Sequence, residues 1–236
     1  MSADSESGSR TRVFPQKAAY FEGEEKMAYF PFFMDLSCRH GLIVGGGTVA
    51  LRKIQKLLPY EARLTVCAPE LLPAIGQIPG LALLRRPFEP AMLDKMDYVI
   101  AATDDAALNH QIAVLCQQRN IPVNVVDDRE TCTFLFPALV KRGELSIGIS
   151  TGGASPSAAV YLKERISDLL PEDFGQMLEY LDSLRAEGKA ALPDGPGRAR
   201  FFSRLFDACI QTGWPLSEAR LREIISDASK DGEENG

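Results

Sequence analysis

Residues 41–53 read Gly-Leu-Ile-Val-Gly-Gly-Gly-Thr-Val-Ala-Leu-Arg-Lys, and this stretch decides the fold of the chain. A short apolar run ends in three glycines, and a pattern typical of a helix follows at once. Gly45, Gly47 and Ala50 fit the G-x-G-x-x-G/A fingerprint, whose glycines allow a tight turn and a close approach of the backbone to a pyrophosphate. We therefore predict cofactor contacts at Gly45, Gly46 and Gly47, with a glycine-rich structural turn as the alternative.

Strand and helix patterns alternate around this stretch. Strands are predicted at residues 40–44, 63–67, 81–86, 98–102 and 122–126, with helical patterns between most of them. This alternation indicates an α/β fold in which helices cover both faces of a parallel sheet. We assign residues 27–127 to this Rossmann-like, NAD-binding domain and expect the cofactor at the carboxyl ends of its strands.

The pattern changes after Asp127. Strand-like runs at 132–136, 138–141 and 145–150 arrive without intervening helices, and the chain is helical in pattern from Ser155 onward. Ser155 is a good N-cap, and Pro156 suits the first helical position. We predict a small strand-rich region at 128–153 and a helical domain at 154–228. The polar segments 1–26 and 229–236 are predicted to be a disordered tail and a frayed tail.

The composition is that of an ordinary globular protein, with 236 residues that are 45% hydrophobic and 25% charged. The formal net charge of −6 argues against a general nucleic-acid binder. No apolar run approaches the roughly 20 residues that span a bilayer, and the N-terminus has no apolar signal core. The five cysteines and two histidines show no metal-ligand spacing. We expect a cytoplasmic protein with reduced thiols, no resident metal, and no membrane or nucleic-acid partner.

Two further loops of the Rossmann-like domain carry candidate cofactor contacts. Ala68-Pro69-Glu70 follows the second strand, where Glu70 either contacts a ribose or caps the next helix. No arginine follows that strand at once, which favours NAD over NADP. Thr103 and Asp104 follow the fourth strand and either border the cofactor or cap the helix that starts at Ala106.

Two later motifs are candidate substrate sites. Asn124-Val-Val-Asp127 delivers an acid at the sheet edge expected to hold the nicotinamide, where a carboxylate could act as a base; a turn aspartate is the alternative. Ser150-Thr-Gly-Gly-Ala-Ser-Pro156 combines a glycine turn with a helix start, so it is either a second anion site or a simple turn. The basic side chains that could line a pocket for carboxylates are Arg129, Lys141, Arg142, Lys163 and Arg165.

Taken together, these motifs resemble the precorrin-2 dehydrogenase and sirohydrochlorin ferrochelatase family, which forms the N-terminal part of sirohaem synthases. The matching pieces are Phe30-Pro-Phe-Phe-Met-Asp-Leu36, Leu42-Ile-Val-Gly-Gly-Gly-Thr-Val-Ala50, Lys53, Leu64-Thr-Val66, Ala101-Ala-Thr-Asp-Asp105, Asn124-Val-Val-Asp127, residues 134–137 and residues 150–156. The resemblance implies an NAD-binding Rossmann domain, a dimerisation region at 128–153, a helical domain and a homodimer. It also implies oxidation of precorrin-2 to sirohydrochlorin with NAD+ and, in many members, insertion of ferrous iron as a substrate to give sirohaem.

The resemblance also assigns roles to single residues. The family's essential aspartate falls on Asp127, which makes Asp127 the expected catalytic residue, and Asn124 and Thr151 are the expected substrate contacts. The family's nucleotide contacts fall on Thr48, Val49, Pro69 and Glu70. Iron insertion stays open, because some members only dehydrogenate. The rival functions are an NAD-sensing module without catalysis and a Rossmann oxidoreductase that acts on another polycarboxylate.

Overall fold

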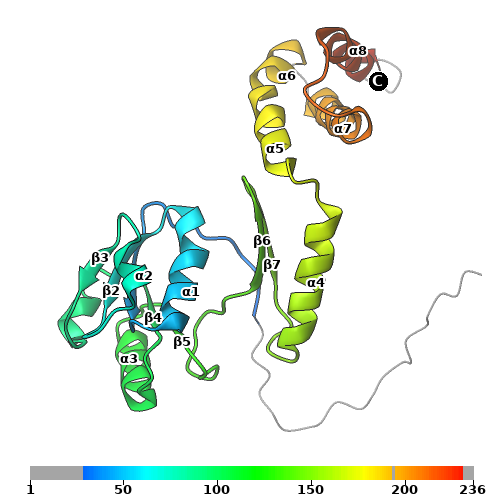
Figure 1. Ribbon diagram of the computed structural model, residues 1–236. Coiled ribbons are helices and arrows are strands. Elements are labelled where there is room, and N and C mark those ends of the chain that lie inside the picture. The colour runs from blue at the N-terminus through cyan, green and yellow to red at the C-terminus, as the bar shows by residue number, and fades with distance from the viewer. Residues whose placement is uncertain (1–28, 193–194, 231–236) are drawn as a thin grey trace, which may run out of the picture.

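The computed structural model describes residues 29–192 and 195–230. A Rossmann unit, a two-stranded hairpin backed by one long helix, and a group of C-terminal helices follow one another along the chain (Figure 1). The predicted fold class is confirmed.

The Rossmann unit contains β1 (His40–Val44), α1 (Thr48–Leu57), β2 (Arg63–Cys67), α2 (Pro73–Gly76), β3 (Ala82–Leu84), β4 (Tyr98–Ala101), α3 (Ala106–Gln118) and β5 (Val123–Val125), with 3₁₀ turns at Leu58–Tyr60 and Pro90–Leu93. After it come β6 (Ala138–Arg142), β7 (Leu145–Ile149), α4 (Pro156–Leu169), α5 (Phe174–Ser183), α6 (Arg185–Ala191), α7 (Gly195–Thr212) and α8 (Glu218–Lys230).

The sheet of the Rossmann unit is parallel, with the strand order β3-β2-β1-β4-β5. Successive strand residues point to opposite faces. Leu42 and Val44 therefore join the core on the α3 face, whereas Ile43 joins the core on the α1 and α2 face. Burial on both faces explains why the strands read as continuous apolar runs. Because the strand order reverses at β1 and β4, the crevice for a ligand opens at their carboxyl ends.

The sequence predicts a strand over residues 132–136, and this prediction is wrong. The segment lies beside β5 but outside the sheet. The Thr133 N–H donates to the Val123 carbonyl at 2.9 Å, while the Thr133 hydroxyl accepts from the Val123 N–H at 2.8 Å. The Asn124 side-chain amide donates to the Phe134 carbonyl at 3.0 Å. Side chains thus take the place of the backbone partners that a strand would need.

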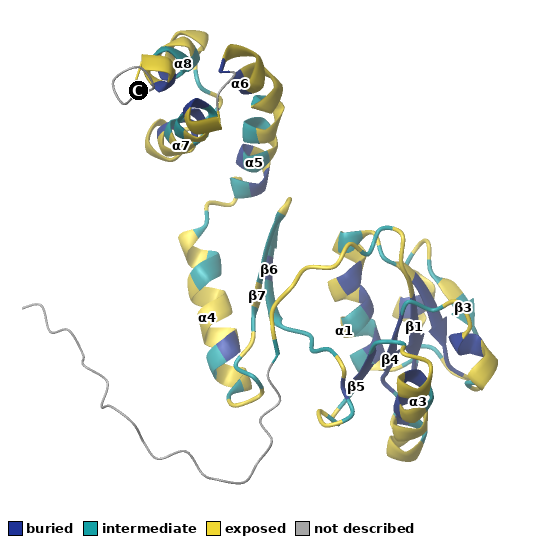
Figure 2. Cartoon of the chain, turned by 180° about the vertical axis from the view of Figure 1, so that it is seen from behind, coloured by how far each residue is buried: buried dark blue, intermediate teal, exposed yellow. Residues whose placement is uncertain are grey.

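The β6–β7 hairpin lies between α1 and α4 in both views (Figures 1 and 2). It joins the 3₁₀ turn that follows α1 through Tyr60, whose hydroxyl lies 3.2 Å from the Ser146 hydroxyl. It joins α4 through Arg142, which donates to the Ser167 hydroxyl at 2.9 Å. Ser155 caps α4 as predicted, since its hydroxyl accepts the Ala158 N–H at 3.2 Å. The hairpin therefore couples the Rossmann unit to α4.

The C-terminal helices have a core of their own, centred on Phe201, Leu205 and Ile224. No residue of α4 belongs to that core, so the predicted helical domain spans two packing units. Helix α8 continues through Ser229 and Lys230, the first two residues of the predicted frayed tail. The predicted disordered tail at 1–26 and the rest of the frayed tail lie outside the described residues, and the domain limits remain predictions. None of the described helices is long and apolar enough to span a bilayer.

Candidate active site

The glycine turn after β1 is packed tightly against the end of β4. Gly45 has φ +130°, a backbone conformation that side chains rarely adopt, and a Cβ at this position would overlap the Ala102 carbonyl oxygen. A Cβ at Gly46 would overlap the Glu70 carbonyl oxygen in the loop after β2. The Leu72 N–H also donates to the Gly46 carbonyl at 2.9 Å. The three loops after β1, β2 and β4 therefore meet at one edge of the sheet.

Gly47 has a different reason to be glycine. It is the N-cap of α1 in an extended conformation, and a Cβ built on it meets no atom within 4 Å. No side chain caps α1, and its first turn carries no acid. The first N–H groups of the helix, at Thr48 and Val49, thus face an open cradle that suits the pyrophosphate of a dinucleotide. These residues fit an NAD cofactor, which would be held by the α1 N-terminus.

The remaining predicted cofactor contacts lie on the two flanking loops. Pro69 and Glu70 are exposed after β2, and Glu70 does not cap α2, whose N-cap is Leu72. After β4, the Thr103 hydroxyl donates to the Asn109 side chain at 2.7 Å, while Asp104 is exposed. The cap of α3 is neither Thr103 nor Asp104.

The N-cap of α3 is Asp105. Its carboxylate accepts the N–H groups of Ala107 and Leu108 at 2.9 and 3.0 Å. With the capping role assigned to Asp105, the alternative role of Asp104 as a helix cap is excluded. Contact of Thr103 and Asp104 with the cofactor stays a prediction.

Asp127 stands in a turn just past the end of β5 and is exposed. Its φ of +60° is left-handed, which aspartate tolerates better than most residues. The buried Cys132 thiol lies behind this turn, 3.3 Å from the Val125 carbonyl and 3.2 Å from the Asp128 carbonyl. Its sulfur also lies 3.1 Å from the Val125 nitrogen. Burial raises the pKa of the Cys132 thiol, so the neutral group braces the Asp127 turn.

Lys53 reaches from α1 to β5, the strand that ends just before the Asp127 turn. Its Nζ donates to Asn124 Oδ1 at 3.1 Å and lies 4.0 Å from the centre of the Phe136 ring. Burial lowers the pKa of Lys53 to about 8, with repulsion from Lys56 as the second cause. The Asp127 carboxylate raises the pKa of Lys53, as a Cys132 thiolate also would.

Asn124 is buried on β5, with both ends of its amide bonded within the protein. Its oxygen accepts from Lys53, and its nitrogen donates to the Phe134 carbonyl. The amide therefore links Lys53 to the segment after β5. Direct contact of Asn124 with a substrate stays a prediction.

Thr151 stands in the glycine loop that precedes α4. Its hydroxyl donates to the Ser155 carbonyl at 3.0 Å and accepts the Ser155 N–H at 3.2 Å, which closes the loop. The Arg129 guanidinium packs so closely on Gly153 that a Cβ there would overlap it. Arg129 follows Asp127 by two residues, so the Asp127 turn and the Thr151 loop adjoin.

The other basic candidates have separate contacts. Lys141 lies over the Tyr60 ring at 4.9 Å, Arg142 bonds to α4, and Arg165 bonds to the Tyr161 hydroxyl at 3.2 Å. Lys163 lies near enough to Lys56 to help lower the pKa of Lys56, after burial of that lysine.

Comparison with known proteins gives matches to this chain along most of its described length. Residues 32–138 match the family described as "Putative NAD(P)-binding", and residues 142–169 match "Sirohaem biosynthesis protein central". A sirohaem synthase of Thioalkalivibrio sulfidiphilus is 42% identical over 184 residues, which are 77% of this chain and 38% of that protein. One of Sodalis glossinidius is 38% identical over 216 residues, or 89% of this chain and 45% of that protein.

A solved structure named "SirC, precorrin-2 dehydrogenase" superimposes with a TM-score of 0.68 at 27% identity, covering 86% of this chain and all of the other. The chain belongs to the precorrin-2 dehydrogenase and sirohaem synthase family. Membership in this family confirms the resemblance drawn from the motifs and the NAD-type cofactor. The chain spans less than half the length of the two sirohaem synthases compared, at 38% and 45%.

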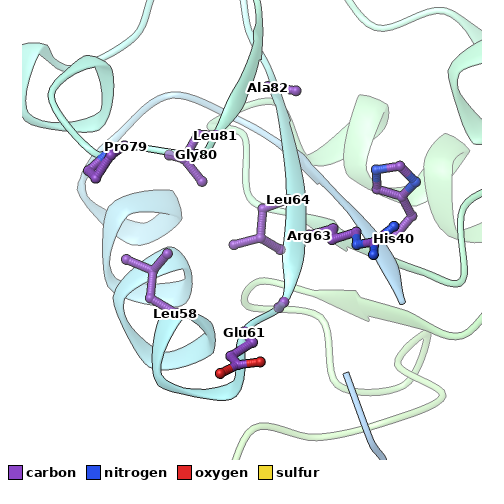
Figure 3. A pocket seen from close by; sticks show the side chains of 10 residues that line it. His40, Leu58, Glu61, Arg63, Leu64, Pro79, Gly80, Leu81 and Ala82 are labelled. Carbon is purple, nitrogen blue, oxygen red and sulfur yellow. The ribbon is translucent and has the colours of Figure 1, made fainter. Parts of the chain in front are cut away.

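One cavity lies at the other edge of the sheet from the glycine turn. A cavity of about 420 Å³ opens at the amino ends of the strands, the edge opposite the glycine turn (Figure 3). Its lining includes His40 and Arg63 at the starts of β1 and β2, Pro79 before β3, and Leu58 at the end of α1. This position separates it from the glycine turn and from Asp127. Among the described residues, no group of three or more His, Cys, Asp and Glu could hold a metal ion.

Sequence reasoning on this family member missed the roles of Lys53 and Cys132. A signal for Lys53 was present in the helix pattern. The buried stripe of α1 runs through Ala50, Ile54 and Leu57, and Lys53 falls on it, three residues after Ala50 and four before Leu57. A lysine on an apolar stripe indicates a buried partner. No comparable signal marks Cys132, whose partners lie on β5 and in the turn.

Proposed function

We propose that this chain catalyses the NAD+-dependent oxidation of precorrin-2 to sirohydrochlorin. The observation that carries the proposal is that the open α1 N-terminus and the Asp127 turn both lie at the carboxyl ends of strands of one parallel sheet, after β1 and β5, while Arg129 packs the Asp127 turn on the Thr151 loop. A nucleotide cradle beside an exposed carboxylate suits the removal of a hydride and a proton from one substrate. The structural likeness to a protein named precorrin-2 dehydrogenase supports the choice of substrate.

NAD+, when bound, accepts the hydride that the oxidation removes. The residues of the chain have two tasks. The α1 N-terminus binds the phosphates, with Gly45, Gly46 and Gly47 shaping the turn. Asp127 accepts the proton that leaves the macrocycle, since an exposed carboxylate can both receive a proton and pass it to water.

Substrate binding requires positive charge in a chain whose net charge is −6. Precorrin-2 is a polycarboxylate, and Arg129 is the basic side chain that packs on the Thr151 loop. We infer that Arg129 pairs with a substrate carboxylate, because a guanidinium matches a carboxylate in geometry as well as charge. Thr151 stands in the same glycine loop and would then border the macrocycle.

A second candidate activity is the insertion of ferrous iron into sirohydrochlorin. The name of the matched relatives, sirohaem synthase, favours it. The macrocycle supplies the nitrogen ligands, so the iron is a substrate and needs no set of protein ligands. Protons must leave the pyrrole nitrogens as the metal enters, and Asp127 is the proposed acceptor.

We also infer that the chain works as a homodimer. Val160, Tyr161 and Leu162 on α4 are 49%, 55% and 43% exposed, and Leu169 at its end is 81% exposed. Figure 2 shows how much of α4 is open on its outer side. Phe30 and Phe33 add exposures of 83% and 77% in the segment before β1. Apolar surface of this extent is typical of a subunit interface.

The test is an anaerobic spectrophotometric assay of precorrin-2 with and without NAD+, followed by addition of Fe2+. NAD+-dependent formation of sirohydrochlorin supports the dehydrogenase, and a further iron-dependent change above the protein-free rate supports chelation. Asp127→Asn is expected to abolish oxidation while the NAD+ Kd stays unchanged. A folded wild-type protein that binds NAD+ but leaves precorrin-2 unchanged would favour the alternative function, an NAD-sensing module without catalysis. Turnover of another polycarboxylate would favour the rival oxidoreductase.

A further inference from the structure

Lys53 is a charged side chain for which the proposed chemistry has so far no use. It extends from the nucleotide-binding helix α1 and ends at Asn124, on the strand that leads into the Asp127 turn. Holding an ammonium group partly away from water costs free energy unless partners offset the cost. A lysine at such a position in the apolar stripe of α1 is therefore expected to have a functional role.

The contacts of Lys53 fix its ammonium group in one place. Asn124 Oδ1 accepts one of its N–H groups at 3.1 Å, and the Phe136 ring lies beneath it at 4.0 Å. Asn124 is itself fixed by its bond to the Phe134 carbonyl. An ammonium group has three donors, so two remain to be directed at other groups.

The charged surroundings of Lys53 come from three parts of the chain. Lys56 lies one turn further along α1 and repels it, whereas Asp127 in the turn after β5 attracts it. Cys132 lies in the segment that follows this turn, and its thiol is neutral because burial raises its pKa. Asn124 on β5 and the Phe136 ring are neutral. Asp127 is thus the carboxylate that favours the charged form of Lys53, and it follows Asn124, the hydrogen-bond partner of Lys53, by three residues.

We propose that Lys53 is a positioning residue of the Asp127 site, and that its charged ammonium group orients the Asp127 carboxylate for proton transfer. The role rests on the proposed oxidation. The Asp127 backbone is braced by Cys132, but among the described residues no hydrogen bond to its carboxylate is found. An ammonium group held by Asn124 places a fixed positive charge near this carboxylate and links the nucleotide helix to the strand that precedes it. The site is then active only while Lys53 is charged.

The experiment measures kcat and kcat/KM for precorrin-2 oxidation against pH in the wild type and three variants. Lys53→Met is expected to lower kcat by on the order of 10- to 100-fold at saturating NAD+, because proton transfer depends on position. Lys53→Arg is expected to retain most of the activity. In the wild type, kcat/KM falls above about pH 8, where Lys53 loses its proton. In Lys53→Arg this fall is absent, because a guanidinium stays charged.

The matched control is Lys56→Met, which removes the same charge from an exposed position on the same helix. Its kcat is expected to stay within about twofold of the wild type. The fall of kcat/KM at alkaline pH should begin at a higher pH in this variant, because repulsion from Lys56 no longer lowers the pKa of Lys53. NAD+ affinity and thermal unfolding of each variant show whether it is folded.

A readout that does not depend on activity is the rate at which trace acetic anhydride acetylates Lys53, followed by mass spectrometry against pH. A midpoint near pH 8 is expected, well below that of an ordinary lysine. The role of Lys53 is overturned if Lys53→Met keeps wild-type kcat, if Lys56→Met loses as much, or if the alkaline fall persists in Lys53→Arg. A wild type that does not oxidise precorrin-2 overturns the proposed function and this role with it.

Discussion

Gly47→Val separates the nucleotide site from the stability of the fold. The Gly47 backbone is extended, with φ −88° and ψ −169°, which valine adopts without strain. A Cβ there meets nothing within 4 Å in the free protein, so the added methyl groups fill only the cradle before α1. The free protein should lose about 1 kcal/mol, because valine is a poorer N-cap than glycine.

NAD+ binding should suffer far more than stability. Losing two charge-assisted hydrogen bonds to the pyrophosphate, at about 1.5 kcal/mol each, raises the Kd by on the order of 100-fold. At an NAD+ concentration of about 100 times the wild-type Kd, the wild type gains about 2.7 kcal/mol and the variant about 0.4 kcal/mol. For a chain of this size, these gains correspond to about 5–11 °C and about 1–2 °C in Tm.

The assay combines calorimetric titration of NAD+ with thermal unfolding, which is measured without NAD+ and at the concentration given above. Gly45→Ala is the contrasting variant, since its left-handed φ and the overlap with Ala102 should destabilise the free protein by about 2–6 kcal/mol. A Gly47→Val protein that binds NAD+ with wild-type affinity would refute the reasoning. The pyrophosphate could then not lie at the N-terminus of α1.

Three further changes test the fold and its assembly. Asp105→Ala removes the cap of α3 and should lower the stability by about 1 kcal/mol, seen as a lower urea midpoint with an unchanged slope. Tyr98→Phe should raise the Tm, because the buried Tyr98 hydroxyl has no hydrogen-bond partner among the described residues and such a group costs about 1–3 kcal/mol; a lower Tm would contradict this reading. Leu162→Glu on α4 should convert the proposed dimer into monomers in light scattering, whereas a monomeric wild type would remove the basis for that interface.

Local signals explain how much of the site was predictable. The turn at Gly45, the cradle at Gly47 and the cap at Ser155 depend on residues within a few positions of one another, so the sequence alone indicated them. The sequence offered Thr103 and Asp104 as caps of α3, whereas the cap is Asp105, because a carboxylate must reach two particular N–H groups and only the actual backbone shows which one does.

The sequence by itself determined the Rossmann sheet, the nucleotide edge and the family, because apolar periodicity and glycine spacing act over short stretches. Only the tertiary structure decided which groups surround Asp127. Lys53 and Asn124 are 71 residues apart, and Arg129 meets Gly153 from another element. The strand prediction over residues 132–136 failed for the same reason, since Thr133 bonds to Val123 of β5 and the Asn124 side chain of β5 bonds to Phe134. Such contacts form only when the chain closes on itself, and no local pattern encodes them.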